Sequence, residues 1–221
     1  IAGATSTGTH GTGLRFGGLA TQITAATLVT GRGEVLRVDD DRRPELLPAV
    51  RLGLGALGIL VEVELQCVDA FLLRSVDHPA PFDEVLDGWE ERTREADHFE
   101  FYWWPHTDLA MTQTKTRLPI DTPHRPPGRF ALWAERRLLE NDALRLQQAV
   151  GHTIPALVPP LSRLATNVYG DGERTALSYQ IFASPRLVRF RESEYAIPLE
   201  ALPQALRDVR GLVERNGWRI S

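Results

Sequence analysis

The chain has 221 residues, of which 43% are hydrophobic and 24% are charged, and its formal net charge is −4. This composition is that of a folded globular protein and excludes a largely disordered chain. The mildly acidic balance excludes a general nucleic-acid binder, because such proteins carry a basic surface. No apolar run approaches the roughly 20 residues needed to cross a bilayer, so membrane insertion is not expected.

The first 70 residues predict a small β-rich unit. Residues 1–20 are dense in glycine and threonine, which predicts a backbone-rich loop and not a helix. The β-branched segment 23–30, a glycine-containing turn and segment 34–38 predict a hairpin. A short helix is expected over 44–54, with proline in its first turn. The clean alternation of 59–68 predicts a strand.

Beyond residue 70 the pattern changes to that of an α+β unit. Pro79 and Pro81 introduce the first helix, and a loop with four prolines spans 118–128. The predicted helices are 82–96, 130–150 and 199–216, the last closed by Gly217. The predicted strands are 98–104, 176–183 and 187–195.

Cys67 is the only cysteine, which excludes an intrachain disulfide and a zinc site built from cysteines. No metal-ligand spacing is present elsewhere, so no metal site is expected. A reducing compartment, and with it a cytoplasmic location, is favoured. Lys115 is the only lysine among 25 basic residues, which suggests a GC-rich bacterial genome. The start at Ile1 and the end at Ser221 both fall inside patterned segments, so a fragment of a longer polypeptide is expected.

The segment Ala2–Gly13 contains four glycines and four threonines, and this pattern is typical of an anion-binding loop. Glycine allows backbone N–H groups to converge on a phosphate or pyrophosphate, and the hydroxyls add donors. No Gly-Lys-Ser/Thr completes a P-loop. A plain glycine-rich turn is the alternative. His10 suits a phosphate contact or a brace for the loop, and a metal-ligand role has little support.

A formal match to the dinucleotide fingerprint occurs at Gly53-Leu54-Gly55-Ala56-Leu57-Gly58. That fingerprint must follow a strand and open a helix, whereas this segment follows a helix and opens a strand. A Rossmann site is therefore rejected. Either these glycines let the backbone press against a flat ligand, or they form a tightly packed turn.

The predicted strand at 98–104 has two different faces. Phe99, Phe101 and Trp103 alternate on one face, which predicts a core contact. Glu100, Tyr102 and Trp104 alternate on the other face, where they would line a cavity or lie at the surface.

The segment Gly3–Gly13 closely resembles the FAD loop of sugar-1,4-lactone oxidases and alditol oxidases, which are vanillyl-alcohol-oxidase-like flavoproteins. Later segments agree in the same order, namely Gly18–Gln22, Gly53–Ile59, His98–Trp103, Pro105–Asp108 and Glu194–Pro198. The resemblance implies an α+β fold. Residues 1–70 would be the C-terminal part of a PCMH-type FAD-binding domain. Residues 71–221 would be the cap or substrate domain, with an antiparallel sheet flanked by helices.

The resemblance also implies FAD as the cofactor. The residues that would hold it are Thr7, Gly8, Thr9, His10, Gly11, Thr12, Gly13, Phe16, Gly17, Gly18, Leu19, Gly55, Gly58 and Ile59. The substrate pocket would include Ala4, Glu100, Tyr102 and Trp104. Ala4 stands where similar alditol oxidases have a serine, which favours a lactone over a polyol. Catalytic residues are not assigned, because the family's Glu-x-Arg pair is expected beyond Ser221, and the chain alone is expected to be inactive.

The implied reaction is hydride transfer from a CH–OH carbon of a small sugar or lactone to flavin N5, followed by reoxidation by oxygen or another acceptor. An alditol oxidase, a non-catalytic flavin-binding relative and a plain phosphate-binding module are the alternatives. The sequence indicates no oligomeric state.

Overall fold

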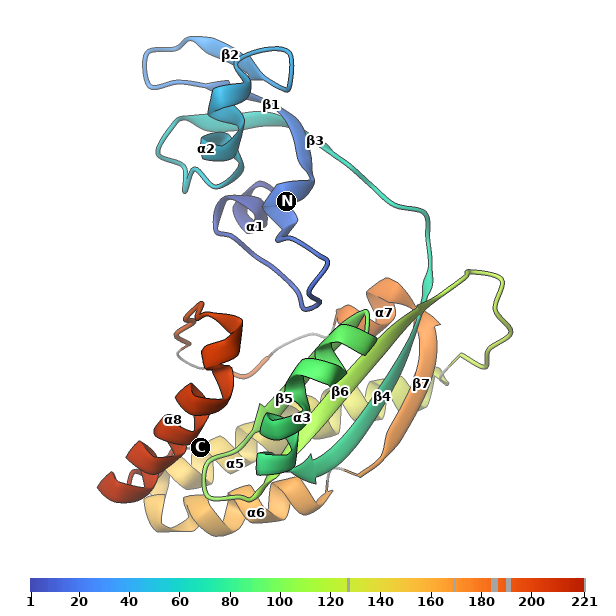
Figure 1. Cartoon of the computed structure of the whole chain (residues 1–221), viewed down its shortest axis with the longest axis vertical. Helices are drawn as coiled ribbons and strands as arrows, with labels where there is room; N and C mark the ends of the chain where they lie inside the picture. Colours follow the sequence, from blue (N-terminus) through green and yellow to red (C-terminus); the bar gives the residue numbers. More distant parts are fainter. Residues whose placement is uncertain (127, 169, 184–186, 190–191, 221) are drawn as a thin grey trace. The chain divides into compact units, whose positions relative to one another are not determined.

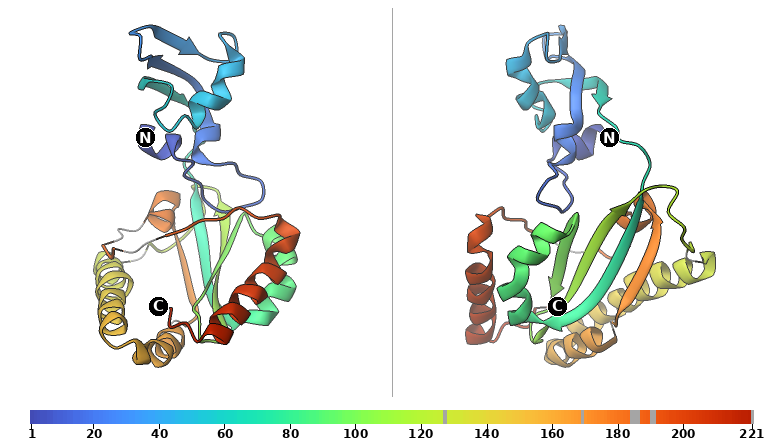
Figure 2. Two further views of the ribbon diagram at one scale, coloured as in Figure 1. Left: turned by 90° about the vertical axis from the view of Figure 1, so that its left-hand side faces the viewer. Right: turned by 45° about the vertical axis from the view of Figure 1, so that its right-hand side comes forward.

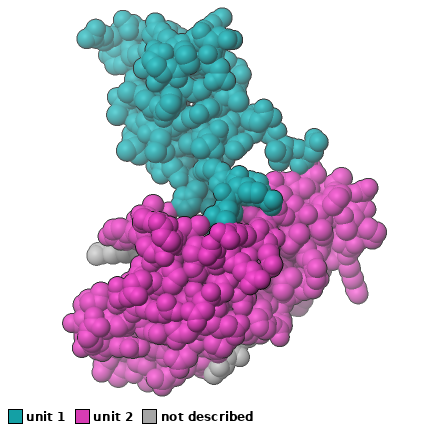
Figure 3. Space-filling model, viewed as in Figure 1, with its two compact units in different colours: residues 1–69 teal, residues 70–221 magenta. Residues whose placement is uncertain are grey.

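The computed structural model describes residues 1–126, 128–168, 170–183, 187–189 and 192–220. The chain forms two compact units, unit 1 (Ile1–Asp69) and unit 2 (Ala70–Ser221), which Figures 1 and 3 distinguish. Each unit has its own sheet and its own buried core. None of the described helices is both long enough and apolar enough to span a bilayer.

Unit 1 is built on a three-stranded antiparallel sheet in the order β2-β1-β3. The strands are β1 (Ile23–Val29), β2 (Val35–Val38) and β3 (Ile59–Leu65), and the predicted hairpin is confirmed by the pairing of β1 with β2. The remaining elements are α1 (Ala2–Ser6), η1 (Leu19–Gln22), η2 (Pro44–Leu46) and α2 (Leu47–Arg51). Ile23, Leu28 and Val38 of the sheet pack on Leu47 and Val50 of α2 to make the core.

The prediction that residues 1–20 contain no helix is wrong at α1. Thr5 Oγ1, within this five-residue helix, donates to the carbonyl of Ala2 at 3.1 Å, and Thr7 Oγ1, just after the helix, donates to that of Gly3 at 3.0 Å. The backbone N–H of Thr5 donates to the carbonyl of Ile1 at 3.0 Å, and that of Thr7 donates to Gly3 at 3.2 Å, so helical backbone bonds form here despite the glycine content.

Unit 2 contains a four-stranded antiparallel sheet in the order β5-β6-β4-β7. The strands are β4 (Leu72–Pro81), β5 (His98–Trp103), β6 (Leu109–Leu118) and β7 (Gly172–Leu177). The longer helices are α3 (Phe82–Glu95), α5 (Leu144–Thr153), α6 (Val158–Val168) and α8 (Leu202–Asn216). The shorter elements are α4 (Arg129–Ala134), the π-helix η3 (Glu135–Ala143), η4 (Pro155–Leu157), α7 (Ser178–Phe182) and η5 (Leu199–Ala201).

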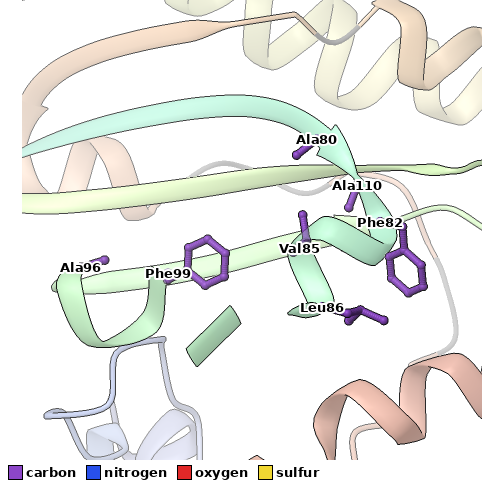
Figure 4. Close-up of a cluster of buried hydrophobic side chains, with 7 residues drawn as sticks. All are labelled: Ala80, Phe82, Val85, Leu86, Ala96, Phe99 and Ala110. Atoms are coloured by element: carbon purple, nitrogen blue, oxygen red, sulfur yellow. The ribbon is translucent and has the colours of Figure 1, made fainter. Parts of the chain in front are cut away.

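The main core of unit 2 lies between the sheet and α3. Phe82, Val85 and Leu86 of α3 pack against Phe99 of β5 and Ala110 of β6, as Figure 4 shows. The second helix on this side, α8, lies outside α3, and α5 and α6 lie across the other face of the sheet (Figure 2). Unit 2 is therefore a three-layer α+β arrangement, in agreement with the predicted class.

Two central strands, β4 and β6, were not predicted. The sequence interpretation took Pro79 and Pro81 as the lead into the helix predicted at 82–96. That helix does begin at Phe82, but both prolines belong to β4. They are two residues apart, so their nitrogens point to the same side of the strand. The strand β7 pairs with β4 only up to Asp77, so the prolines lose no hydrogen bond to it.

Two further predictions fail near the end of unit 2. The expected strand 176–183 is mostly wrong, because β7 ends at Leu177 and α7 follows. Its partner β4 begins at Leu72, opposite Leu177, so residues after Leu177 have no residue of β4 to pair with. The expected strand 187–195 is also wrong for its described residues, since the backbone N–H of Leu187 donates to Asn141 Oδ1 at 2.7 Å. Residues 190 and 191 lie outside the described part.

Most of the predicted helices are confirmed with small changes of boundary. The segment predicted at 82–96 is α3, and the segment at 130–150 falls within α4, η3 and α5. The last predicted helix is η5 and α8, and Gly217 ends it in the left-handed region with φ 62°. The helix α6 was missed.

Candidate functional site

The glycine-rich segment of unit 1 forms a loop that is closed at its base. The backbone N–H of Leu19 donates to the carbonyl of Thr9 at 2.8 Å, and that of Phe16 donates to Gly13 at 3.1 Å. His10 and Gly11 are exposed on this loop. The loop between Thr9 and Leu19, called here the Thr9 loop, exposes Gly11 together with the larger side chains of Leu14, Arg15 and Phe16.

Backbone conformation or packing within the protein accounts for three glycines of this segment. Gly8 and Gly13 have φ of 77° and 111°, and a Cβ on Gly17 would lie 2.5 Å from Thr21 Oγ1. Gly3, within α1, and Gly11, on the exposed loop, differ from these, because no described protein atom lies within 4 Å of the Cβ that either would carry and neither has a φ in the left-handed region. The packing of unit 1 therefore does not require glycine at position 11. Close approach of another molecule to the backbone would require it.

The polar groups of the Thr9 loop are only partly those that the sequence suggested. Thr7, which precedes the loop, directs its hydroxyl back to α1, where it donates to the carbonyl of Gly3. His10 Nδ1 lies 3.0 Å from the carbonyl oxygen of Gly11, so that nitrogen is the donor and the ring braces the loop. Arg15 is exposed on the same loop and was overlooked, although it is the one charged residue between Thr9 and Leu19.

The second glycine segment, 53–59, connects α2 to β3, which confirms that the dinucleotide fingerprint has the wrong context here. A Cβ on Gly58 would lie 2.3 Å from the carbonyl oxygen of Val29, and φ of Gly58 is 144°. Packing on β1 therefore accounts for Gly58. Gly55 has φ 76° and open space around it, and the side chain of Ile59 is 71% exposed.

The two segments come together within unit 1. A Cβ on Gly8 would lie 3.2 Å from Leu52 Cδ1, so the end of α1 contacts the residue that follows α2. Large apolar side chains are exposed on both segments, namely Leu14, Phe16, Leu52, Leu54, Leu57 and Ile59. Exposed glycines and exposed large apolar side chains thus occur together on these two segments.

The predicted pocket residues of unit 2 form a connected polar cluster. Tyr102 Oη donates to Glu100 Oε2 at 3.2 Å. Lys115 Nζ donates to Glu100 Oε1, and also to Gln113 Oε1 at 3.1 Å. The ring centroids of Tyr102 and Trp104 are 6.5 Å apart. Unit 2 therefore brings Glu100, Tyr102 and Trp104 together, whereas Ala4 belongs to unit 1.

Lys115 and Gln113 of this cluster were missed by the sequence interpretation. They alternate on β6, a strand that was not predicted because threonine, glutamine and lysine fill most of its second half. The spacing of two between Gln113 and Lys115 was the available signal. The other face of β5 is as predicted, since Phe99, Phe101 and Trp103 contact the core.

The turn after β5 holds Trp104 in place. Thr107 Oγ1 donates to the carbonyl of Trp104 at 2.8 Å, and Trp103 Nε1 donates to that of Thr107 at 2.9 Å. His106 has φ 75°, and burial, followed by the nearby charge of Arg163, lowers its pKa. The neutral ring is therefore favoured. The hydrogen bonds of Trp103 and Thr107 connect the turn to the neighbouring aromatic pair.

Among the described residues, no three His, Cys, Asp or Glu side chains lie close enough together to hold a metal ion. A surface hollow of about 410 Å³ lies on α3, lined by Asp87, Gly88, Glu90, Glu91, Arg94 and Glu95. It contains none of the predicted site residues, and its mostly acidic lining does not suit an anionic cofactor.

The model of the family described as D-arabinono-1,4-lactone oxidase matches residues 63–221. The chain belongs to the D-arabinono-1,4-lactone oxidase family. L-gulono-1,4-lactone dehydrogenase of Mycobacterium tuberculosis H37Rv is 39% identical over 220 residues, which are 100% of this chain and 50% of that protein. L-gulonolactone oxidase of Bos taurus is 30% identical over 216 residues, which are 97% of this chain and 48% of that protein. This member of the lactone oxidase family therefore spans about half the length of the curated relatives it matches.

The fold of this family member is also found in solved structures. A cholesterol oxidase variant from Brevibacterium sterolicum superposes with a TM-score of 0.67 at 17% identity and covers 96% of this chain and 45% of that one. At such low identity the likeness concerns the fold alone. It supports the α+β class over nearly the whole lactone-oxidase-family chain.

Proposed function

We propose that the intact protein is an FAD-dependent oxidoreductase that oxidises a CH–OH group of a sugar-1,4-lactone or a related sugar. Membership of the D-arabinono-1,4-lactone oxidase family supports this proposal, as do relatives named for gulono- and arabinono-lactones. In this proposal unit 1 is the C-terminal part of the FAD-binding domain, and unit 2 is the substrate domain.

The observation that carries the cofactor assignment is Gly11. It lies on the Thr9 loop, where the fold of unit 1 leaves space for a side chain that the sequence does not use. Backbone N–H groups of such a loop suit a pyrophosphate, and Arg15 adds a positive charge. The proposed FAD contacts are Thr7, Gly8, Thr9, His10, Gly11, Thr12, Gly13, Phe16, Gly17, Gly18, Leu19, Gly55, Gly58 and Ile59. FAD bound there would supply the flavin N5 that accepts the hydride.

For the substrate, we keep Glu100, Tyr102 and Trp104 of unit 2 and Ala4 of unit 1. Carboxylate and phenol oxygens suit the hydroxyl groups of a sugar, and the exposed aromatic rings suit its C–H face. Oxygen or another acceptor would take the electrons. A cytoplasmic location and a bacterial source remain parts of the proposal, the latter because one lysine stands among 25 basic residues.

The proposal is tested on the intact protein purified from a flavin-sufficient host. We expect a flavin absorption spectrum that bleaches when an aldono-1,4-lactone is added without oxygen. A colourless protein would contradict the flavin assignment. A yellow protein that lactones leave oxidised, but a polyol reduces, would favour the alditol oxidase alternative.

A glycine pair tests the Thr9 loop directly. Gly11→Ala should weaken FAD binding about tenfold or more, because a methyl group would block one charge-assisted hydrogen bond to the cofactor. Gly31→Ala is the matched control, since Gly31 is also exposed, has open space around its Cβ position and lies in the β1–β2 turn.

Both variants should keep the unfolding free energy of the wild-type apoprotein. The measurement is a titration of apoprotein with FAD, followed by flavin fluorescence. Equal FAD affinities for the two variants would remove the Thr9 loop from the cofactor site.

A further inference from the structure

The polar cluster on β5 and β6 is unusual because its only cation is buried while its carboxylate is partly open. The Lys115 side chain is 5% exposed, and that of Glu100 is 27% exposed. Lys115 is also the single lysine of the chain. Burying an ammonium group is costly unless it is paired and hydrogen-bonded, so this position is occupied for a specific reason.

The strand register explains how the cluster is assembled. Glu100 pairs directly with Gln113 across the ladder, and Lys115 is its diagonal neighbour on the same face. Lys115 donates to both of these side chains, so one oxygen of the Glu100 carboxylate, Oε1, is fixed by the ammonium group. The neighbouring cation Arg117 is turned elsewhere, towards the Phe71 ring and His98.

The outer end of the cluster is rich in acceptors. Tyr102 is exposed and directs its hydroxyl to Glu100. The Tyr102 and Trp104 rings lie beside this edge. The surface that results combines a partly exposed carboxylate, whose cation lies buried behind it, with an aromatic side.

We infer that Lys115 is a positioning residue, and that the Glu100 and Tyr102 oxygens it orders form an acceptor edge for the hydroxyls of a neutral sugar lactone. This inference rests on the proposed function. Because the cation is buried, the edge discriminates against the anionic open-chain acid that forms when a lactone hydrolyses. The cluster is thus a specificity element for the closed, uncharged form of the substrate.

The test measures equilibrium binding to the oxidised intact flavoprotein through the change in its flavin spectrum, with an aldono-1,4-lactone and with the corresponding aldonate. Glu100→Gln should weaken lactone binding about tenfold, because a charged hydrogen bond is lost. It should also reduce the ratio of the lactone affinity to the aldonate affinity. Tyr102→Phe should weaken lactone binding several-fold. Glu173→Gln is the matched control, because Glu173 pairs with Arg74 on the same sheet and lies outside the cluster.

A double variant separates positioning from stability. Lys115→Met should weaken lactone binding and lower the melting temperature, since it leaves Glu100 without its buried partner. Combining Lys115→Met with Glu100→Gln should restore the melting temperature but not the lactone affinity. Recovery of both would mean that the cluster only stabilises the sheet, and would overturn the inference.

Tyr102→Phe keeps the test decisive if the lysine variant does not fold, because Tyr102 is exposed. Unchanged lactone affinity in Tyr102→Phe and Glu100→Gln, with a wild type that binds lactone, would overturn this inference alone. A wild-type protein whose flavin spectrum no lactone perturbs or bleaches would overturn the proposed function as well.

Discussion

Gly58 shows how one residue joins two strands of unit 1. Its φ of 144° is a conformation that side-chain-bearing residues rarely adopt, and its α-carbon lies against the backbone of Val29 at the end of β1. Packing against β1 therefore explains the last glycine of the formal dinucleotide fingerprint. Packing does not explain Gly11, because nothing in unit 1 occupies the space beside it.

We predict that Gly58→Ala destabilises unit 1 by roughly 2 kcal/mol or more, since the methyl group combines backbone strain with a clash against a carbonyl. Urea unfolding of the intact protein, followed by far-UV circular dichroism, measures the loss. Gly31→Ala provides the comparison. A Gly58→Ala midpoint within error of that control would contradict the packing explanation.

At the scale of elements, α3 and α8 are joined by charges across their exposed sides. Arg210 makes a bidentate contact with Asp83, with both N–O distances 3.0 Å, and Arg207 pairs with Asp87. The hydrogen bond from Arg210 is the main cause that lowers the pKa of Asp83. The amphipathic face of α8, with Leu206 on the core, supplies the rest of the contact.

We predict that Asp83→Asn lowers the stability of unit 2 by about half a kcal/mol, which is typical of an ion pair open to solvent. Because the folded pKa of Asp83 is lowered, its contribution is complete above the pKa of an unfolded aspartate. It is lost as the pH falls through the folded value. Thermal unfolding of wild type and variant should therefore converge at acid pH. Glu90→Gln, which breaks a pair within α3 only, is the comparison for an ion pair that does not join the two helices.

For the whole molecule, each unit has a sheet and a buried core of its own, so local changes should be felt first within their own unit. We predict that Gly58→Ala speeds amide hydrogen exchange in β1 and β3 more than in β4 and β6. Lys115→Met should do the reverse. Peptide-resolved exchange with mass spectrometry checks both. Equal loss of protection in the two sheets would show that the units unfold as one.

Features that depend on neighbouring residues could be predicted from the sequence, and features that depend on distant strands could not. The hairpin, β5 and α8 were predictable because turn glycines, alternation and helical spacing are written within each segment. The alternation of β5 also placed Glu100 and Tyr102 on one face. Nothing local identified Lys115 as their partner, because its position depends on how β6 aligns with β5.

The sequence alone thus determined the family resemblance, the glycine-rich loop and the α+β class, since each depends on residues close together in the chain. The tertiary structure decided the strands β4 and β6, the end of β7 and the burial of the one lysine. Strands 72–81 and 109–118 carry prolines and polar residues that their propensities alone would not place in a sheet. They are strands because hydrogen bonds to distant partners satisfy their backbones, and no residue within either segment identifies those partners.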